Sequence, residues 1–388
     1  MNLQPGKFGI RKLVAAILFG VTLMLVGRAN PQDPDPSLSN DHPLFEVNLR
    51  NLGYKTFDGE KRIPTFVDFT DINRLAVAWL TLDDHPVAKK AGPRTPEPAH
   101  LHVFLLDAIT GQKQDPQEWS TPSYPVRVLG LHDGKFLACT GNVLRLFSPS
   151  FEVTQEQLLS NGRDCRSISP NKQLLLLSSY AYAENHQNTL LDVGTFAVVA
   201  EWTEKELIYN ISNHRLIGSR PKLWELCIRE IDQSWHPFQP AGMDKQFDDY
   251  KRKSAFFVND GTLVIEAGRE MAVATVDGTL LLRVILDKNR SFDSTLASSG
   301  GERFAVIENR LRGMTEPELD LYAFPSNDRV VVYSVPDRRA IYALKVKGTS
   351  AWSPWGRHVN QLALCPDGTL LAVVSDEILQ VYRLPGKQ

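Results

Sequence analysis

Two histidines in this chain are spaced so that they could act together. His100 and His102 stand two residues apart in a predicted strand, which places both imidazoles on the same face. Two imidazoles on one face can hold a transition metal when further ligands are near. The chain has only nine histidines, and no further histidine or cysteine stands close to this pair. We therefore predict a structural role for the pair and no metal ligand in the chain.

Paired carboxylates are the second feature that could do chemistry. They occur at Asp83-Asp84 and at Asp248-Asp249, and both pairs stand in hydrophilic stretches. A general acid needs a carboxyl whose pKa is raised by burial, and nothing in these stretches implies burial. The sequence also lacks the motifs of metalloproteases, phosphate-cradling loops, nucleophile elbows and EF-hands. We predict no catalytic residue, no cofactor and no cofactor-binding residue.

Arginine and tryptophan side chains in predicted loops are the best candidates for binding. Both types give large contact areas or planar hydrogen bonding, and they often dominate interface energies. The predicted binding residues are Arg310, Arg312, Trp352 and Trp355, while Trp119 and Trp235 stand in further segments that we expect to be exposed connections. The alternative interpretation is that these tryptophans cap the packed core.

The elements that must position these residues are predicted to be β-strands. Short apolar runs alternate with Asp-Gly, Asn or Pro from residue 44 almost to the C-terminus, and helical periodicity is rare. One unit recurs seven times: a short apolar strand, a tight polar turn and a more strongly apolar second strand. The turns stand at residues 71, 133, 171, 213, 260, 300 and 367.

The spacing of these turns predicts an all-β, seven-bladed β-propeller made of four-stranded antiparallel blades. The shorter spacings, 38 to 47 residues, bracket the length of one such blade. The last unit has only about three strands, so we expect the N-terminal strand at residues 44–49 to complete it and remove an open edge. Insertions at 82–98, 181–188 and 308–318 stand between second and third strands, so they should share one rim with the blade connections.

The chain resembles the WD-repeat-like and YVTN-type seven-bladed propellers over roughly residues 44–385. The clearest carrier is LALCPDGTLLAV at 362–373, which is similar to the family's apolar-x-apolar-Ser-Pro-Asp-Gly-x-x-Leu-Ala signature with Cys365 in place of Ser. ISPNK at 168–172 and LDAITG at 106–111 are further matches. The Gly-His and Trp-Asp dipeptides of true WD repeats are absent. The resemblance implies a fold that mainly supplies binding surfaces and in some members carries an enzyme.

The N-terminus has the three-part layout of a secretory signal. Lys7, Arg11 and Lys12 precede an uncharged apolar run at 13–26, and Gly27-Arg28-Ala29 offers small residues for cleavage. An uncleaved anchor is the alternative, although the run is short for a membrane span of about twenty residues. We predict export to the periplasm or extracellular space, with a signal peptide at 1–29, a flexible segment at 30–43 and the propeller domain at 44–388.

Four cysteines allow two interpretations. Cys139, Cys165, Cys227 and Cys365 each stand within or beside an apolar run, where a buried thiol behaves as a small hydrophobe. We favour four singly buried cysteines. The alternative is a disulfide between Cys139 and Cys165, because an exported chain permits disulfides and neighbouring repeats could bring these two together.

Composition narrows the function classes. The formal net charge is −2, from 43 basic and 45 acidic residues, so no bulk field indicates nucleic acid as a partner. We predict a monomeric, exported, non-catalytic scaffold that binds a protein or another exported ligand through its loop-bearing rim, with no stable membrane span after cleavage. The alternative is an exported propeller enzyme, of hydrolase or quinone-dependent dehydrogenase type, with its site at the channel mouth. Calcium held by Asp68 and Asp293 is compatible with the sequence.

Overall fold

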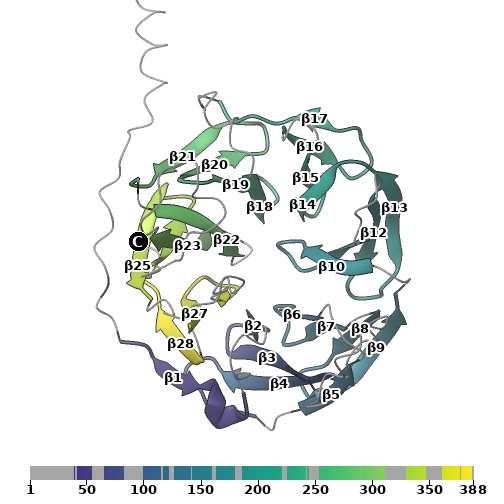
Figure 1. Ribbon diagram of the computed structural model, residues 1–388, viewed down its shortest axis with the longest axis vertical. Helices are drawn as coiled ribbons and strands as arrows, with labels where there is room; N and C mark the ends of the chain where they lie inside the picture. The colour runs from purple at the N-terminus through teal and green to yellow at the C-terminus, as the bar shows by residue number, and fades with distance from the viewer. Residues whose placement is uncertain are drawn as a thin grey trace, which may run out of the picture.

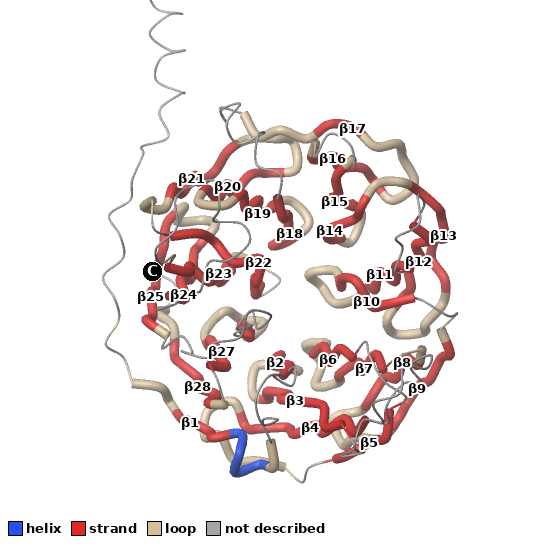
Figure 2. The backbone as a smooth tube through the Cα atoms, in the orientation of Figure 1, coloured by secondary structure: helices blue, strands red, loops and turns tan. Residues whose placement is uncertain are grey.

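The fold is a ring of seven four-stranded antiparallel sheets (Figure 1). A computed structural model describes residues 39, 42–54, 65–82, 99–114, 117–121, 126–140, 142–159, 163–179, 186–220, 225–241, 243, 253–288, 290–298, 301–310, 329–346, 361–375 and 377–386. In this described part the helical element is one 3-10 turn, η1 (Leu49–Leu52), and all other regular structure is strand (Figure 2). The predicted all-β, seven-bladed propeller is therefore confirmed.

Each blade follows the chain outward from the centre of the ring. Blade 1 consists of β2 (Thr65–Phe69), β3 (Arg74–Leu82), β4 (Ala99–Asp107) and β5 (Gln117–Thr121). Blade 2 consists of β6 (Val126–Gly130), β7 (Phe136–Thr140), β8 (Val143–Phe147) and β9 (Val153–Leu158). Blade 3 consists of β10 (Arg163–Ile168), β11 (Leu174–Ser179), β12 (His186–Asp192) and β13 (Val198–Glu204). Blade 4 consists of β14 (Leu207–Ile211), β15 (Arg215–Ser219), β16 (Leu226–Glu230) and β17 (His236–Pro237). Blade 5 consists of β18 (Lys253–Asn259), β19 (Thr262–Ala267), β20 (Glu270–Thr275) and β21 (Leu280–Ile285). Blade 6 consists of β22 (Arg290–Ser298), β23 (Arg303–Arg310), β24 (Arg329–Ser334) and β25 (Arg339–Lys345). Blade 7 consists of β26 (Gln361–Leu364), β27 (Leu370–Ser375), β28 (Ile378–Arg383) and the N-terminal β1 (Phe45–Asn48). All seven predicted turns lie between the innermost and second strands.

In several blades the second strand is buried along its whole length. Every residue of β7, β19 and β27 is buried. A blade packs on a neighbour across each of its faces, so a strand in the middle of the sheet has no solvent-facing side. The alternation of polar and apolar residues is consequently lost, and these strands have continuous apolar sequences such as LLAVVS in β27.

The N-terminal strand closes the ring as predicted. β1 pairs with β28 in antiparallel register, with Phe45 opposite Val381 and Val47 opposite Leu379. Leu49 follows directly, is fully buried, and donates its backbone N–H to the Glu377 carbonyl at 2.7 Å. Because β1 is far from β28 in sequence, this pairing joins the two ends of the domain.

Most of the predicted signal peptide and flexible segment, residues 1–43, lies outside the described residues. Within it, Ser39 donates its backbone N–H to the carbonyl of Ala343 in β25 at 2.8 Å. The chain therefore contacts the outer strand of blade 6 before it enters blade 7. In the described part of the chain, no helix has the length and apolar character needed to cross a membrane.

Blades 2 and 3 are joined covalently. Cys139 in β7 and Cys165 in β10 form a disulfide, with their Cα atoms 6.5 Å apart. The favoured interpretation of four single thiols is therefore wrong for this pair and right for Cys227 and Cys365, which are buried free cysteines. Sequence spacing alone does not reveal the bridge, because the contact arises only when neighbouring blades pack face to face.

Cys365 makes the hydrogen bonds that a serine makes at the same position of the matching turn. Its Sγ accepts the backbone N–H of Leu370 at 3.1 Å and donates to Oδ1 of Asp367 at 2.5 Å. In the matching turn of blade 3, Ser169 Oγ accepts the N–H of Leu174 at 2.9 Å and donates to Asn171 at 2.8 Å. The pKa of the Cys365 thiol is raised, mainly by burial. The thiol therefore keeps the proton that it donates to Asp367.

The glycine of the same turn should be sensitive to substitution. Gly368 has φ of 71°, and a Cβ there would stand 2.9 Å from Cδ of Arg303. We expect Gly368→Val to lower the free energy of unfolding by about 1–3 kcal/mol through backbone strain. Urea denaturation of the purified variant measures this loss.

Gly261→Val is the matched control for Gly368→Val. The Asp-Gly sequence at 260–261 predicts a positive φ at Gly261, and that prediction is wrong. Gly261 is outside the left-handed region, and the nearest atom to an added Cβ there is Oδ1 of Asn259, at 3.7 Å. The Asn259 side chain, which accepts the Gly261 N–H at 2.9 Å, stabilises this turn instead. Equal losses at the two positions would contradict the assignment of strain to Gly368.

Candidate functional site

The direction of the strands gives the ring two different rims. Strands one and three of a blade run toward one rim, and strands two and four run toward the other. We call the first the short-turn rim; on it, for example, β18 and β19 are joined by only Asp260 and Gly261. The second, the long-loop rim, receives both ends of the segments 83–98 and 311–328 and of the blade connections 244–252 and 347–360. The sequence analysis predicted that the insertions share one rim with the blade connections, and the strand directions explain why they do.

The four predicted binding residues belong to the long-loop rim by their place in the chain. Arg310 is the last residue of β23, which ends at this rim. The Arg310 side chain and the whole of Arg312, Trp352 and Trp355 lie outside the described residues. Their role in binding stays a prediction.

Two other tryptophans pack between strands instead of serving as exposed connections. Trp119 lies within β5, and its ring is 4.6 Å from that of Phe147 and 6.2 Å from that of Phe151, so it joins blade 1 to blade 2. Trp235 lies just before β17 inside blade 4, and its indole donates to Glu204 of blade 3 at 2.7 Å. For these two residues the interpretation as packing is correct.

A buried ion cluster lies where β23 ends and β24 begins. Glu308 of β23 is 1% exposed, and its Oε2 accepts from Nε and Nη2 of Arg329 at 3.1 and 2.8 Å. Arg290 of β22 reaches the same oxygen at 3.3 Å. Two guanidinium groups therefore share one carboxylate at the long-loop end of blade 6, which anchors the start of β22 and β24 to β23.

The histidine pair lies on one face of β4, as predicted. Nδ1 of His100 is 3.1 Å from Oε1 of Glu118, and Nδ1 of His102 is 3.3 Å from Oε2. The His102 ring stacks on Trp79 with centroids 5.7 Å apart, and burial is the main cause that lowers its pKa. Within the described ranges, no group of three or more His, Cys, Asp or Glu side chains is placed to hold a metal ion.

Asp68 at the central channel joins blades instead of standing open for a cation. Its Oδ2 accepts the backbone N–H of Gly130 in blade 2 at 2.9 Å and lies 3.2 Å from Nζ of Lys172 in blade 3. Asp68 and Lys172 are 18% and 12% exposed, so this ion pair is largely shielded from water. The side chain of Asp293, the other carboxylate considered for calcium, lies outside the described residues.

His132 in the innermost turn of blade 2 is affected by this ion pair. Its pKa is lowered to about 4, first by burial and then by the positive charge of Lys172, against smaller opposing effects of Asp68 and Asp133. The ordinary value is 6.5, so below that pH the unfolded chain takes up a proton that the folded chain does not. We expect the free energy of unfolding to fall by about 3 kcal/mol in total as pH drops from 6.5 to 4.

His132→Asn tests this pH dependence. His132 has φ of 68°, a left-handed conformation that Asn adopts more readily than most residues. Denaturation midpoints measured between pH 7 and 4 should show a smaller acid-dependent loss in the variant. The control is His214→Asn, at an exposed histidine in the innermost turn of blade 4. This control should lose as much unfolding free energy at acid pH as the wild type does. The same slope in all three proteins would exclude His132 as the source.

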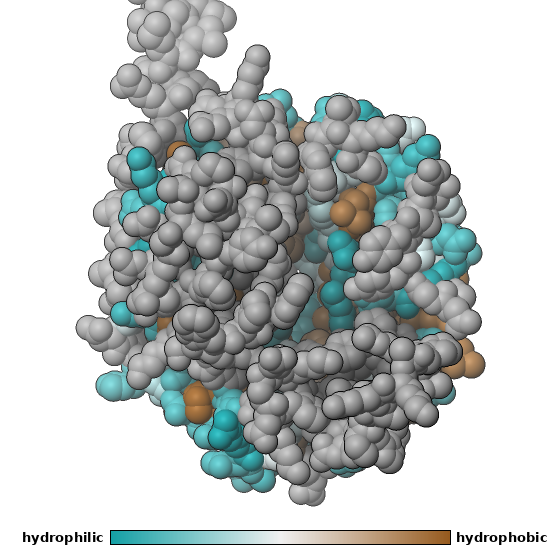
Figure 3. All heavy atoms as spheres, viewed as in Figure 1, coloured by the Kyte–Doolittle hydropathy of each residue, from teal (hydrophilic) through white to brown (hydrophobic). Residues whose placement is uncertain are grey.

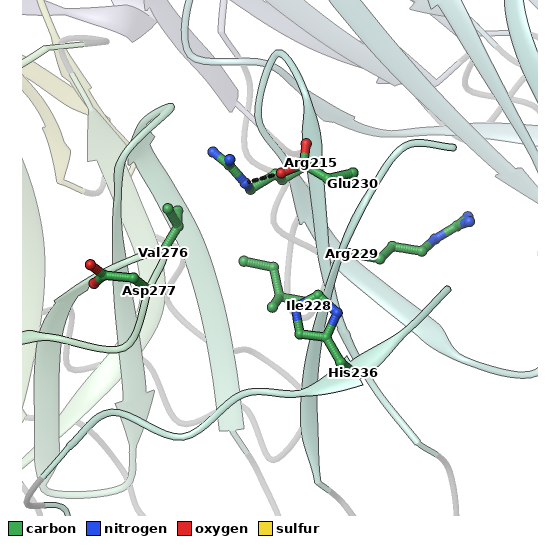
Figure 4. Close-up of a pocket in the computed structure, with 7 residues that line it drawn as sticks. All are labelled: Arg215, Ile228, Arg229, Glu230, His236, Val276 and Asp277. Carbon is green, nitrogen blue, oxygen red and sulfur yellow. Dashed lines mark ion pairs between the residues drawn. The ribbon is translucent and has the colours of Figure 1, made fainter. Parts of the chain in front are cut away.

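A cavity of about 220 Å³ lies between blades 4 and 5 on the short-turn rim (Figure 4). Ile228 of β16 and Val276, just after β20, form its apolar walls, and Arg215 lies across it. Nε of Arg215 is 2.7 Å from Oε1 of Glu230, and its Nη1 donates to the Asp260 carbonyl at 3.1 Å. His236, Asp277 and Arg229 complete the lining.

This cavity exists because the outer strand of blade 4 is short. β17 has two residues and pairs only with Cys227 and Ile228, whereas β13 and β25 each have seven. The last two residues of β16, Arg229 and Glu230, have no outer-strand partner as a result. The sequence analysis missed this site, and the one signal for it is the polar sequence DQSWHP at 232–237 where an outer strand is due.

Away from the cavity, the described surface carries few apolar side chains. On the face shown in Figure 3 the described surface is mainly hydrophilic, with separate hydrophobic spots. Large apolar residues that are more than half exposed include Leu158 (72%), Ile285 (58%) and Val198 (54%), and these belong to three different blades.

Comparisons with known proteins add no function to this fold. No family model matches this chain, and no curated protein matches it. Among solved structures, it is similar to a chain of the mitotic checkpoint complex, with 12% identity, a TM-score of 0.49 and coverage of 92% of this chain and 100% of that one. It is also similar to Hsv2p of Kluyveromyces lactis, with 12% identity, a TM-score of 0.43 and coverage of 83% of this chain and 98% of that one. A third similar structure is BamB from Moraxella catarrhalis, with 12% identity, a TM-score of 0.40 and coverage of 83% of this chain and 85% of that one. Likenesses this distant carry no argument about what the chain binds.

Proposed function

We propose that this protein is an exported, non-catalytic scaffold that binds another polypeptide through its long-loop rim. The observation that carries the proposal is topological: the segments 83–98, 244–252, 311–328 and 347–360 all begin and end at one rim of a rigid ring. Loops anchored on a rigid frame can differ in sequence without disturbing the core, which is why binding residues concentrate in them. Arg310, Arg312, Trp352 and Trp355 stand in or beside these segments.

Export is supported by two independent features. Residues 7–29 have the layout of a cleavable secretory signal. The disulfide between Cys139 and Cys165 is of a kind that persists in oxidising compartments and is rare in reducing ones. N-terminal sequencing of secreted material should begin near Asn30, and an intact Met1 on a membrane-embedded product would contradict cleavage.

The disulfide should contribute measurably to stability. It closes a loop with a sequence separation of 26 residues, and a cross-link of this size lowers the entropy of the unfolded chain. We expect the Cys139→Ala/Cys165→Ala variant to lose about 2–4 kcal/mol of unfolding free energy, and reductant to weaken the wild type but not the variant. A variant as stable as the oxidised wild type would contradict a bond in the folded protein.

Binding is tested by quantitative pull-down from the exported fraction. The variant carries alanine at Arg310, Arg312, Trp352 and Trp355, and we expect it to recover its partner at least about tenfold less well, since such residues each contribute about 2 kcal/mol when they are hot spots. The matched control carries alanine at two basic and two aliphatic residues exposed on the short-turn rim, Lys113, Arg383, Ile72 and Ile109. Partner loss in the control alone, or equal recovery by all three proteins, would overturn the proposal.

A further inference from the structure

The outer strand of blade 6 is covered, although it stands at the edge of its sheet. β25 has three consecutive buried residues, whereas no residue of β9, β13 or β21 is buried, and all four are outermost strands (Figure 1). Tyr342 and Leu344 pack on blade 7, but Ala343 packs on the opposite face and is 0% exposed, backbone included. A buried backbone at a sheet edge needs partners for its polar groups, so a further segment of polypeptide should lie along β25.

Ser39 indicates where this segment comes from. Its backbone N–H donates to the Ala343 carbonyl at 2.8 Å. In an antiparallel sheet the N–H and C=O of one residue point to the same side, so both groups of Ala343 face the outer edge, and those of Lys345 do too. This contact is continuous with the closure by β1, because Leu44 donates its N–H to the Val381 carbonyl at 2.7 Å.

The sequence before Ser39 fits an edge strand. Since the Ser39 N–H faces β25, the strand period of two places the N–H of Ser37 and of Asp35 on the same side. The alternate positions would face away, and two of them are Pro36 and Pro34, which have no N–H. Proline is tolerated in an edge strand when its nitrogen faces solvent, and the residue before a proline favours an extended backbone.

The charges of the two segments are complementary. β25 (RAIYALK) carries Arg339 and Lys345 and no acid, whereas DPDPSLS at 33–39 carries two aspartates and no base. β25 and β1 both run toward the long-loop rim, so the chain between Ser39 and the start of β1 runs opposite to β25. The same direction before Ser39 brings Ser37 beside Lys345 and an aspartate just beyond it, and opposite charges on neighbouring strands attract.

We propose that residues 34–38, which lie outside the described residues, add a fifth antiparallel strand to blade 6 along the outer edge of β25. The prolines of this strand face away from the sheet, so the new edge offers no N–H at those positions to another chain. The strand adds a few exposed hydrogen bonds and little apolar burial, so its loss leaves the melting temperature of the ring nearly unchanged. This inference goes beyond the proposed scaffold function and does not depend on it.

Amide hydrogen exchange of the full mature chain tests the proposal. The Lys345 N–H faces the outer edge and should exchange at least about tenfold faster when residues 30–38 are deleted, because it loses its acceptor. The amides of β9, an uncovered outer strand, should exchange equally in both proteins and serve as the internal reference. Equal exchange at Lys345 in the two proteins would overturn the proposal.

Two proline variants test which side of the segment faces β25. Ser37→Pro removes an N–H that should bond to β25, so the Lys345 amide should again exchange about tenfold faster. Leu38→Pro is the matched control, because the N–H that it removes faces solvent, and exchange at Lys345 should stay as in wild type. Equal effects of the two variants, or a larger effect of Leu38→Pro, would reject the assigned strand. A melting curve of each variant shows that the ring is folded.

Discussion

Deletion of residues 44–50 should destabilise the whole ring instead of loosening one end of it. The deletion removes β1, leaves β28 as an open edge in blade 7, and takes Leu49 out of the core. Replacing a single buried leucine by alanine costs about 2–5 kcal/mol, so the loss of the entire strand should exceed that. We expect a lower melting temperature and aggregation, since an unpaired strand edge is a template for intermolecular pairing.

The deletion of residues 30–38 is the control for the loss of the strand. It removes a stretch without apolar periodicity and leaves Ser39, which bonds to β25, in place. Its melting temperature should stay within about a degree or two of wild type, because segments of this composition bury little surface. Leu49→Ala refines the comparison by testing the core contribution alone. If the 44–50 deletion melts like wild type and stays monomeric, closure by β1 is not what holds the ring together.

Glu204→Ala should be a strongly destabilising substitution outside the apolar core. The Glu204 carboxylate accepts the indole N–H of Trp202 and of Trp235, each at 2.7 Å, and lies 3.4 Å from Nη2 of Arg229. The side chains of Arg229 and Glu204 are only 11% and 10% exposed. Removing one partner of such a pair leaves an uncompensated charge and two unpaired indole donors, so we expect a loss of about 3–5 kcal/mol.

Glu201→Ala is the matched control because it removes the same chemical group from the same strand. The Glu201 side chain is 53% exposed and pairs with Arg163 at 3.1 Å, so its loss should cost under about 1 kcal/mol. A double-mutant cycle with Arg229→Met then isolates the coupling within the cluster. Additive losses, or equal losses for the two glutamates, would show that the cluster does not act as a unit. The measurement is the urea unfolding curve of each protein.

The same cluster joins two neighbouring blades. Trp202 belongs to blade 3, and Arg229 and Trp235 belong to blade 4, so the cluster fixes the outer part of one blade against the next.

The sequence alone predicted the frame of this protein because that frame follows from local chemistry. Turn residues at seven places, each followed by an apolar run, mark the innermost and second strands, since a strand buried on both faces needs a continuous apolar sequence. The missing fourth strand of the last blade pointed to residues 44–49, because a sheet with an open edge calls for a partner. The turn and strand signals lie within a few residues of one another, so periodicity and turn chemistry are enough to detect them, whereas the role of residues 44–49 was inferred from the number of strands in the last unit.

The sequence did not predict the contacts between blades, because they join residues far apart in the chain. The disulfide of Cys139 with Cys165, the ion pair of Asp68 with Lys172, and the packing of Trp119 and Trp235 all depend on how one sheet lies on the next. The residues around each tryptophan do not show whether it binds a partner or packs in the core. The residues around each polar turn residue at the channel likewise do not show whether it binds a ligand or joins blades, and only the arrangement of the blades decides. The cavity beside Arg215 is the clearest case: it arises from a two-residue outer strand and from walls supplied by two blades, and only the tertiary structure brings those walls together.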